Sequence, residues 1–227
     1  MPYEKYERIK LPYELNDLEW IVSFLTMHYH YIILHKNYEL KLLETLRGKK
    51  VEEESEIEKK FPTLIKLMEN LEQLSEEIRK NVRFFGGGLI NHNFFFYHLT
   101  KFKVQPADYQ VEKRINPFLL SLIIEKFTSL ERLKKEMVKS ALQVRGSGWT
   151  WLVLNKNSEL EIINTEYQDG PWALHLRPLI AIDVWEHAYV IDYHNSPNGR
   201  KEYVEKLLDH LLNWEYISQL CLDYTNN

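Results

Sequence analysis

The fold class that the sequence predicts is α+β: a long α-helical hairpin domain, then an α/β domain with a small three-stranded antiparallel sheet covered by helices. Two observations predict it. In the N-terminal part, apolar residues recur at intervals of three and four, which is the helical period. After Gly148 the pattern changes to short aromatic and aliphatic runs separated by turn residues, which is typical of strands.

The helical hairpin is predicted from two periodic segments. From Asn16 to about Leu46 the helical period continues without Pro or Gly, and Pro62 to Phe84 repeats it. The charge-rich stretch between them, Arg47 to Lys60, is interpreted as a solvated helix end or hairpin tip. Gly86-Gly87-Gly88 is expected to break the second helix before a further apolar segment, Leu89 to Thr100.

A linker is expected at Lys101 to Tyr109, where the periodicity is lost and Pro106 occurs. It divides the chain into a helical-hairpin domain, residues 1–102, and an α/β domain, residues 103–227.

The second domain is predicted to begin with two helices and to end with one. The first two are Asn116 to Phe127 and Leu130 to Gln143, and a capping box of Thr128 and Glu131 opens the second of them. After a polar loop, the amphipathic segment Glu202 to Leu212 is predicted to be the final helix.

The sheet is predicted from three segments between these helices. Trp149 to Asn155 is rich in aromatic and aliphatic residues, Lys156-Asn157-Ser158 is a turn, and an alternating run begins at Leu160. Together they predict a β-hairpin. Leu179 to Val184 supplies the third strand.

Composition limits the classes of function. The chain has 227 residues, 44% of them hydrophobic, and a net charge of -4. These values fit a soluble globular protein and give no reason to expect binding to nucleic acid or to a membrane. Cys221 is the only cysteine, which excludes an intrachain disulfide and a multi-cysteine metal site. Because no signal-peptide pattern and no long apolar run occurs, we expect the protein in the cytoplasm.

Histidines of the first predicted helix are the first candidates for metal ligands. His30, Leu34 and Tyr38 are four residues apart, so they fall within about 80° of one another on one helix face. His28 and His35 are expected to point elsewhere. A single histidine on a helix is more often a core or surface residue than a ligand, so His30 needs partners.

Three further residues can supply such partners. His92 follows the glycines, beside closely approaching backbone, although it could instead cap a helix. Asp183 and His187 are four residues apart where the third strand ends, and an aspartate there is costly unless it is paired or binds a metal. Three imidazoles and one carboxylate would form a set of nitrogen and oxygen ligands suited to manganese or iron.

Several short segments carry a family pattern in a fixed order: Leu11-Pro12-Tyr13 to Glu19, Thr26-Met27 to His30 and Tyr38, Asn91-His92, Gly146 to Leu152, Asp183 to Tyr189, and Asn213-Trp214. Through them the chain resembles the iron/manganese superoxide dismutase family over nearly its whole length. The resemblance implies a metal between the two domains, ligated by one water or hydroxide and by His30, His92, Asp183 and His187. It also implies that the protein dismutes superoxide to dioxygen and hydrogen peroxide with a metal that cycles between +3 and +2.

The resemblance further assigns residues around the metal. Tyr38 is similar to a tyrosine at the mouth of the substrate channel that relays protons, and Gln168 to a glutamine against the metal-bound solvent. Gly88 corresponds to the small residue that makes room for this glutamine, and the pair favours manganese over iron. The residues similar to the aromatic walls of the family's site are Phe96, Trp149 and Trp185.

Two positions depart from the family. Leu34 stands where a channel histidine is usual, and Val190 where a tyrosine usually reaches that histidine across a dimer interface. Glu186 is expected to meet the ligand histidine of a second subunit, with Ser147 also near the two-fold axis. The resemblance therefore implies a homodimer, or a tetramer of two such dimers, with an altered proton relay.

Two other interpretations compete with a dismutase. The main alternative is a catalytically weak or inactive family member that serves as a structural or interaction module, which the altered channel would allow. Such a module has no need to keep the four ligands together with Gln168 and Tyr38, so we favour the enzyme. A di-iron carboxylate oxygenase is excluded because no histidine follows a glutamate by three residues.

Overall fold

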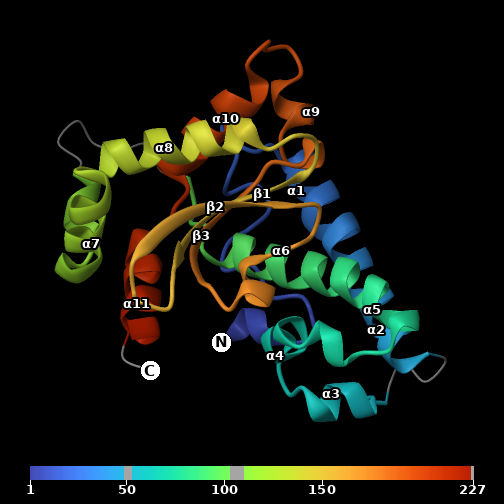
Figure 1. The fold of residues 1–227 in the computed structure, drawn as a ribbon. Coiled ribbons are helices and arrows are strands. Elements are labelled where there is room, and N and C mark those ends of the chain that lie inside the picture. Colours follow the sequence, from blue (N-terminus) through green and yellow to red (C-terminus); the bar gives the residue numbers. More distant parts are fainter. Residues whose placement is uncertain (49–52, 103–109, 226–227) are drawn as a thin grey trace.

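A computed structural model describes residues 1–48, 53–102 and 110–225. Figure 1 shows a small sheet at the centre, with the N-terminal helices on one side of it and the C-terminal helices around the rest. Helix α8 packs on β1 and β2, whereas α6 and α11 pack on β3. Helix α6 therefore joins the N-terminal helices to the sheet. Residues 103–109, which hold most of the expected linker, lie outside the described residues, and the division of the chain near residue 102 stays a prediction.

The first long helix begins later than the sequence predicts. It runs as α1 (Phe24–Met27), a π-helical segment (His28–His35) and α2 (Lys36–Arg47). The predicted start at Asn16 was wrong, because Ser23 caps the helix: its hydroxyl accepts a hydrogen bond from the Thr26 amide at 3.2 Å. The short 3-10 helix Pro2–Glu4 precedes it near the N-terminus.

The second arm of the hairpin is not one helix over Pro62 to Phe84, as predicted. It is interrupted after Glu69, where the Asn70 side chain donates to the Lys66 carbonyl at 2.9 Å and so competes with the backbone. The elements are α3 (Glu56–Lys60), α4 (Leu64–Glu69), a 3-10 turn (Leu71–Gln73), α5 (Glu76–Asn81), a π-helical segment (Val82–Gly86) and α6 (Gly87–Tyr97).

The predicted break at Gly86-Gly87-Gly88 was also wrong, because the helix continues through these residues. Gly86 and Gly87 have φ values of -66° and -58°, which are helical. Their lack of a side chain serves close packing rather than a turn.

The charge-rich stretch, whose last part forms α3, is only partly solvated, and its residues 49–52 lie outside the described residues. Glu58 is 1% exposed, and its carboxylate accepts a hydrogen bond from Arg47 Nε at 2.8 Å. This pair ties the end of α2 to α3.

The two helices predicted to open the second domain are present as α7 (Pro117–Phe127) and α8 (Leu130–Gln143). The predicted capping residue was wrong by one position. Ser129 caps α8 by accepting from the Arg132 amide at 3.1 Å, while Thr128 takes a left-handed conformation with φ 68° that ends α7. A 3-10 turn, Val111–Arg114, precedes α7.

The sheet has three antiparallel strands, as the sequence predicts, and their order is β2-β1-β3. Its strands are β1 (Gly148–Leu154), β2 (Leu160–Glu166) and β3 (Arg177–Asp183). The central strand β1 is buried along its whole length, and its Trp149 lies opposite Asp183 on β3. These elements confirm the α+β class with a helical N-terminal domain.

The C-terminal elements are more numerous than the sequence pattern predicts. Two 3-10 turns, Pro171–Leu174 and Glu186–Ala188, flank β3 and are followed by α9 (Val190–Tyr193), α10 (Gly199–His210) and α11 (Trp214–Thr225). The helix predicted over Glu202 to Leu212 corresponds to α10, so α11, which buries Cys221, was missing from the periodicity analysis. In the described part of the chain, no helix has the length and apolar character needed to cross a membrane.

Candidate metal centre

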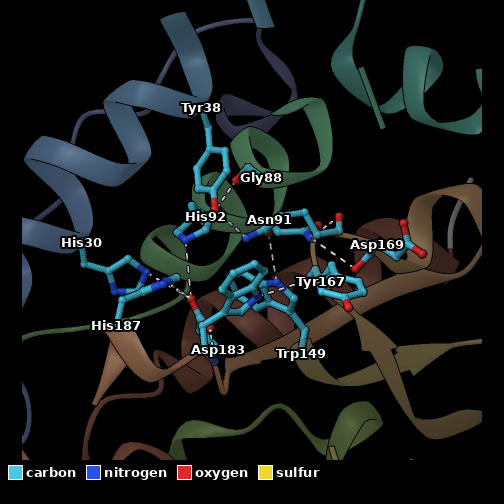
Figure 2. Close-up of polar contacts among 12 residues, drawn as sticks. His30, Tyr38, Gly88, Asn91, His92, Trp149, Tyr167, Asp169, Asp183 and His187 are labelled. Atoms are coloured by element: carbon cyan, nitrogen blue, oxygen red, sulfur yellow. Dashed lines mark hydrogen bonds and ion pairs between the residues drawn. The ribbon is translucent and has the colours of Figure 1, made fainter. Parts of the chain in front are cut away.

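Four side chains that the sequence singled out lie together between the two halves of the molecule (Figure 2). His30 comes from the first π-helical segment and His92 from the middle of α6. Asp183 ends β3, and His187 lies in the 3-10 turn that follows. One ligand atom from each residue lies within 4.8 Å of the others. This is the only such group of three or more His, Cys, Asp or Glu residues in the described ranges.

The Asp183 carboxylate lies at the centre of this group. Its Oδ2 atom is 3.1 Å from His30 Nε2, 3.5 Å from His92 Nε2 and 3.2 Å from His187 Nε2. The other carboxylate oxygen, Oδ1, accepts a hydrogen bond from the Trp185 amide at 2.9 Å. The backbone therefore fixes one oxygen of Asp183 and leaves the second directed at the three imidazoles.

The histidine rings are oriented in the way that metal ligands require. His92 Nδ1 donates to the Gly88 carbonyl at 2.6 Å, which leaves Nε2 without a proton and available as a ligand. The Nε2 atoms of His30 and His92 are buried and make no hydrogen bond of acceptable geometry. Unpaired buried nitrogens beside an aspartate are costly unless an ion sits among them, so the residues fit a metal with nitrogen and oxygen ligands.

The protonation states also suit a metal site. Burial lowers the pKa of His30 to about 4, against the opposing effect of the Asp183 carboxylate close to its Nε2 atom. Burial and then the charge of His30 lower the pKa of His92 well below its usual range. Burial would raise the pKa of Asp183, but the charge and hydrogen bond of His187, and next the close approach of His30, outweigh it and hold that pKa low. At neutral pH, His30 and His92 are neutral and the carboxylate is ionised, as metal binding requires.

Gln168 and Tyr38 lie beside this group and contact each other. Gln168 is 1% exposed, its Nε2 donates to the Tyr38 hydroxyl at 2.9 Å, and its Oε1 accepts from Trp149 Nε1 at 3.2 Å. Burial, and next the charge of Asp183, raise the pKa of Tyr38. The hydroxyl of Tyr38 therefore keeps its proton at neutral pH.

Asn91 holds the backbone at Gln168, and the sequence analysis gave this residue no role of its own. Its Nδ2 donates to the Gln168 carbonyl at 3.0 Å, and its Oδ1 accepts from Trp172 Nε1 at 3.0 Å. Asn91 is fully buried next to His92 on α6. A polar residue next to His92 in a largely apolar helix was a signal in the sequence that could have identified it.

The glycines of α6 allow the close approach of these residues. A β-carbon on Gly88 would overlap the ring of Tyr38, and one on Gly87 would overlap the backbone carbonyl of Gln168. The family resemblance implied that Gly88 makes room for Gln168. In the structure Gly87 lies against Gln168, and Gly88 lies against Tyr38.

Aromatic rings enclose the ligands on several sides. Trp149 meets His92 edge to face with ring centroids 5.1 Å apart, Phe96 meets His30 at 4.9 Å, and Trp185 lies 5.5 Å from His187. Trp149 and Phe96 are fully buried, whereas Trp185 is half-buried. The apolar surroundings limit the access of water to the ligand atoms.

His35 was expected to point away from the site, and this was wrong. It is fully buried, and its ring stacks on His92 with centroids 5.5 Å apart and an angle of 29° between the planes. The reason is the π-helical segment, in which hydrogen bonds span five residues, so that His35 follows His30 by about one turn.

The remaining candidates lie at the surface around the site. Leu34 and Ser147 are half-buried, while Glu186 and Val190 are exposed. Glu186 makes no ion pair within the described ranges. A single chain thus leaves the expected interface residues uncovered, and their role stays a prediction.

Comparison with known proteins gives two kinds of match. Residues 5–100 match the family model described as "Iron/manganese superoxide dismutases, alpha-hairpin domain", and residues 116–220 match the one described as "Iron/manganese superoxide dismutases, C-terminal domain". A relative from Staphylococcus aureus, "Superoxide dismutase [Mn/Fe] 2", is 32% identical over 210 residues, which cover 92% of this chain and 94% of the relative.

Proposed function

Because the chain belongs to the iron/manganese superoxide dismutase family and is a superoxide dismutase, we propose that His30, His92, Asp183 and His187 hold its catalytic metal. The observation that supports this proposal is the convergence of three imidazole nitrogens and one carboxylate oxygen within 4.8 Å of one another. The enzyme converts two superoxide ions and two protons into dioxygen and hydrogen peroxide. The alternative of an inactive structural module gains no support from the family matches or the relative.

A bound manganese or iron ion would supply the one-electron chemistry, since both metals are stable in two adjacent oxidation states. The four residues would bind that ion, with Asp183 as the only anionic ligand from the protein. The aromatic side chains Phe96, Trp149 and Trp185 would keep bulk water away from it. Excluding water from the site strengthens the electrostatic interactions there.

Proton supply is the second requirement of the reaction, and we assign it to Tyr38 with the help of Gln168. The Tyr38 hydroxyl accepts a hydrogen bond from Gln168 Nε2 and retains its own proton to donate. Gln168 has a second N–H bond on the same nitrogen, which is available for a solvent ligand of the metal. Together these residues would hold the protons that the product peroxide needs.

We propose manganese as the preferred metal, with iron as the other candidate. A hydrogen bond from Gln168 to bound solvent would change the acidity of that solvent and the potential of the metal together. The rigid placement of Gln168 by Trp149 and Asn91 supports this role, since a mobile amide could not tune either property reproducibly.

We also propose that the protein is a homodimer, and that pairs of dimers could form a tetramer. Apolar side chains are exposed on the π-helical segment that carries His30, namely Tyr29 and Ile33, and on elements next to the other ligands, namely Phe84 before α6 and Val190 at the start of α9. Together with exposed Glu186 beside His187, they would be covered by a second subunit.

We further propose that the protein is located in the cytoplasm. The single cysteine suits a reducing compartment, and cell fractionation tests this location.

The proposed metal site is tested by measuring metal content and activity in the same preparation. Protein purified without added metal is analysed by mass spectrometry for manganese and iron, and its rate of superoxide removal is measured. We expect about one ion per chain and an activity that follows the metal content. Active protein without manganese or iron would contradict the proposal.

A further inference from the structure

A short N-terminal segment, Glu7-Arg8-Ile9, contacts both ligand-bearing helices. Arg8 Nη1 donates to the Tyr31 carbonyl at 2.8 Å, and Tyr31 donates through its hydroxyl to the Ile9 carbonyl at 2.6 Å. The Arg8 guanidinium also lies 4.8 Å from the centre of the Tyr31 ring. This segment is therefore bound to the residue that directly follows His30.

The same segment is bound to the residue that follows Tyr38. The Arg8 amide donates to Glu39 Oε1 at 3.1 Å, and Arg8 Nε donates to Glu39 Oε2 at 3.3 Å. Both side chains are 20% exposed, so the pair is largely shielded from solvent. A charge-assisted hydrogen bond in such a place is stronger than one at the surface.

A third set of contacts reaches the residue that follows His92. The Ile9 amide donates to Asn93 Oδ1 at 3.0 Å, and Asn93 Nδ2 donates to the Glu7 carbonyl at 3.0 Å. Asn93 is fully buried on α6. The three residues of the segment are thus bonded to the chain immediately after His30, Tyr38 and His92.

The position of these contacts has a geometric consequence. In a regular α-helix, side chains eight residues apart, such as those of His30 and Tyr38, differ in direction by about 80°. The π-helical segment His28–His35 contains more residues in each turn and reduces that difference. In such a wide turn each carbonyl accepts a hydrogen bond from the amide five residues later, and its second lone pair can accept from a donor outside the helix. Arg8 is such a donor, at the carbonyl of Tyr31 within the segment.

We propose that Arg8 is a positioning residue: through Tyr31 and Glu39 it holds the π-helical turn that directs both His30 and Tyr38 toward the same site. This inference rests on the proposed function, because it assumes that His30 is a metal ligand and Tyr38 a proton donor whose relative orientation affects the reaction. Arg8 itself touches neither of them. Its effect on the reaction is indirect and passes through the Tyr31 carbonyl and the Glu39 side chain.

The test compares four variants of the full-length protein, purified with its metal. Arg8→Ala removes the guanidinium bonds to the Tyr31 carbonyl and to Glu39. Arg8→Lys keeps a cation but lacks the two guanidinium nitrogens that reach both acceptors, and Glu39→Gln removes the charge of the partner while keeping Arg8. Arg114→Ala is the matched control, because Arg114 also pairs with a glutamate, Glu215, through Nε at 3.0 Å, but does so between a 3-10 turn and α11. Glu39→Gln also serves as the second variant in case Arg8→Ala does not fold.

Hydrogen exchange of peptides that cover residues 28–39 is measured first, and kcat and KM are then measured separately. For Arg8→Ala we expect exchange in these peptides to rise about tenfold above that of Arg114→Ala, with little change elsewhere, because a charge-assisted hydrogen bond is lost locally. We expect kcat to fall with KM nearly constant and the metal retained, and Arg8→Lys to lie between the wild type and Arg8→Ala.

Two outcomes would overturn the proposal. If hydrogen exchange of residues 28–39 and kcat are unchanged in both Arg8→Ala and Glu39→Gln, the π-helical turn holds its shape without the Arg8 side chain and its pairing with Glu39. A rise in exchange spread evenly over the whole chain would show that Arg8 serves general stability only. Failure of the proposed metal site gives a different result, since the wild type itself would then lack manganese and iron.

Discussion

Gln168 donates a hydrogen bond to Tyr38 across 2.9 Å, although the two residues are 130 positions apart in the chain. The contact joins a loop after β2 to the first long helix at the edge of the metal centre. The Gln168 amide and the Tyr38 hydroxyl are directly hydrogen-bonded. A substitution of either residue should therefore alter proton supply without removing a proposed metal ligand.

The first prediction concerns Gln168→Ala. The four ligands are untouched, so the metal should remain, but turnover should fall by about 10- to 100-fold, the range found for residues that support metal ligands. The reduction potential should also shift. Metal content, kcat and potential are measured on the same preparation. Normal turnover and potential in a fully metallated variant would place Gln168 outside the functional site.

The second prediction concerns His187→Ala. Three ligands cannot hold the ion as four do, and removal of one should abolish retention of metal through purification. His194→Ala is the control, since His194 is an exposed histidine seven residues later. Mass spectrometry should find about one ion per chain in the control and almost none in His187→Ala. Stoichiometric metal in His187→Ala would remove the ligand assignment.

The third prediction compares two glycines of the same continuous helix. Gly88→Ala would force a β-carbon into the ring of Tyr38 and should lower both stability and turnover, with overpacking of this kind costing about 1–3 kcal/mol. In Gly86→Ala the new β-carbon meets the sulfur of Met68, a flexible neighbour, at 3.1 Å and side-chain carbons of Leu42 and Val82 at ordinary contact distances of 3.6 and 3.7 Å, so this variant should be tolerated. Thermal unfolding and kcat are measured for both. Equal behaviour of the two variants would contradict the packing argument.

The fourth prediction addresses the two positions that depart from the family. Leu34→His with Val190→Tyr should raise turnover more than either change alone, because a relay across a dimer interface needs both partners. The dimer itself should survive in every variant, since apolar contact can close the interface. Sedimentation equilibrium and kcat are the measurements. A monomer at micromolar concentration would remove the rationale for the pair.

The fifth prediction concerns pH. Burial lowers the pKa of His98 to about 4 from 6.5, and this residue lies away from the ligands, with Nδ1 on the Phe94 carbonyl. The folded state therefore disfavours protonation that the unfolded state accepts below pH 6.5. The contribution of His98 to the free energy of unfolding is therefore fully present above pH 6.5. It is lost as pH falls toward 4, which lowers the free energy of unfolding by about 3 kcal/mol. Chemical denaturation of His98→Gln should show a weaker dependence over this window; an identical slope would refute the assignment.

The three strands were predicted from local signals, whereas the four candidate ligands were predicted from local signals together with the family resemblance. Asp183 ends an apolar strand, and Trp149 begins another, so short patterns suffice. His35 and Gly87 could not be placed in this way. Apolar periodicity cannot distinguish an α turn from a π turn, and a glycine that breaks a helix cannot be distinguished from one that allows another chain segment to approach. Both outcomes depend on tertiary contacts with residues far along the chain.

The arrangement of the ligands along the chain bears on how the enzyme acquires its metal. His30 and His92 belong to the first half of the chain, whereas Asp183 and His187 follow the third strand and come late in synthesis. Domains generally fold as units and from the N-terminus during synthesis, so the helical part can form while only two ligands exist. We therefore predict that the enzyme takes up its metal only after β3 has been translated. The ion that the enzyme carries should reflect the metals available where folding is completed rather than those near the emerging chain.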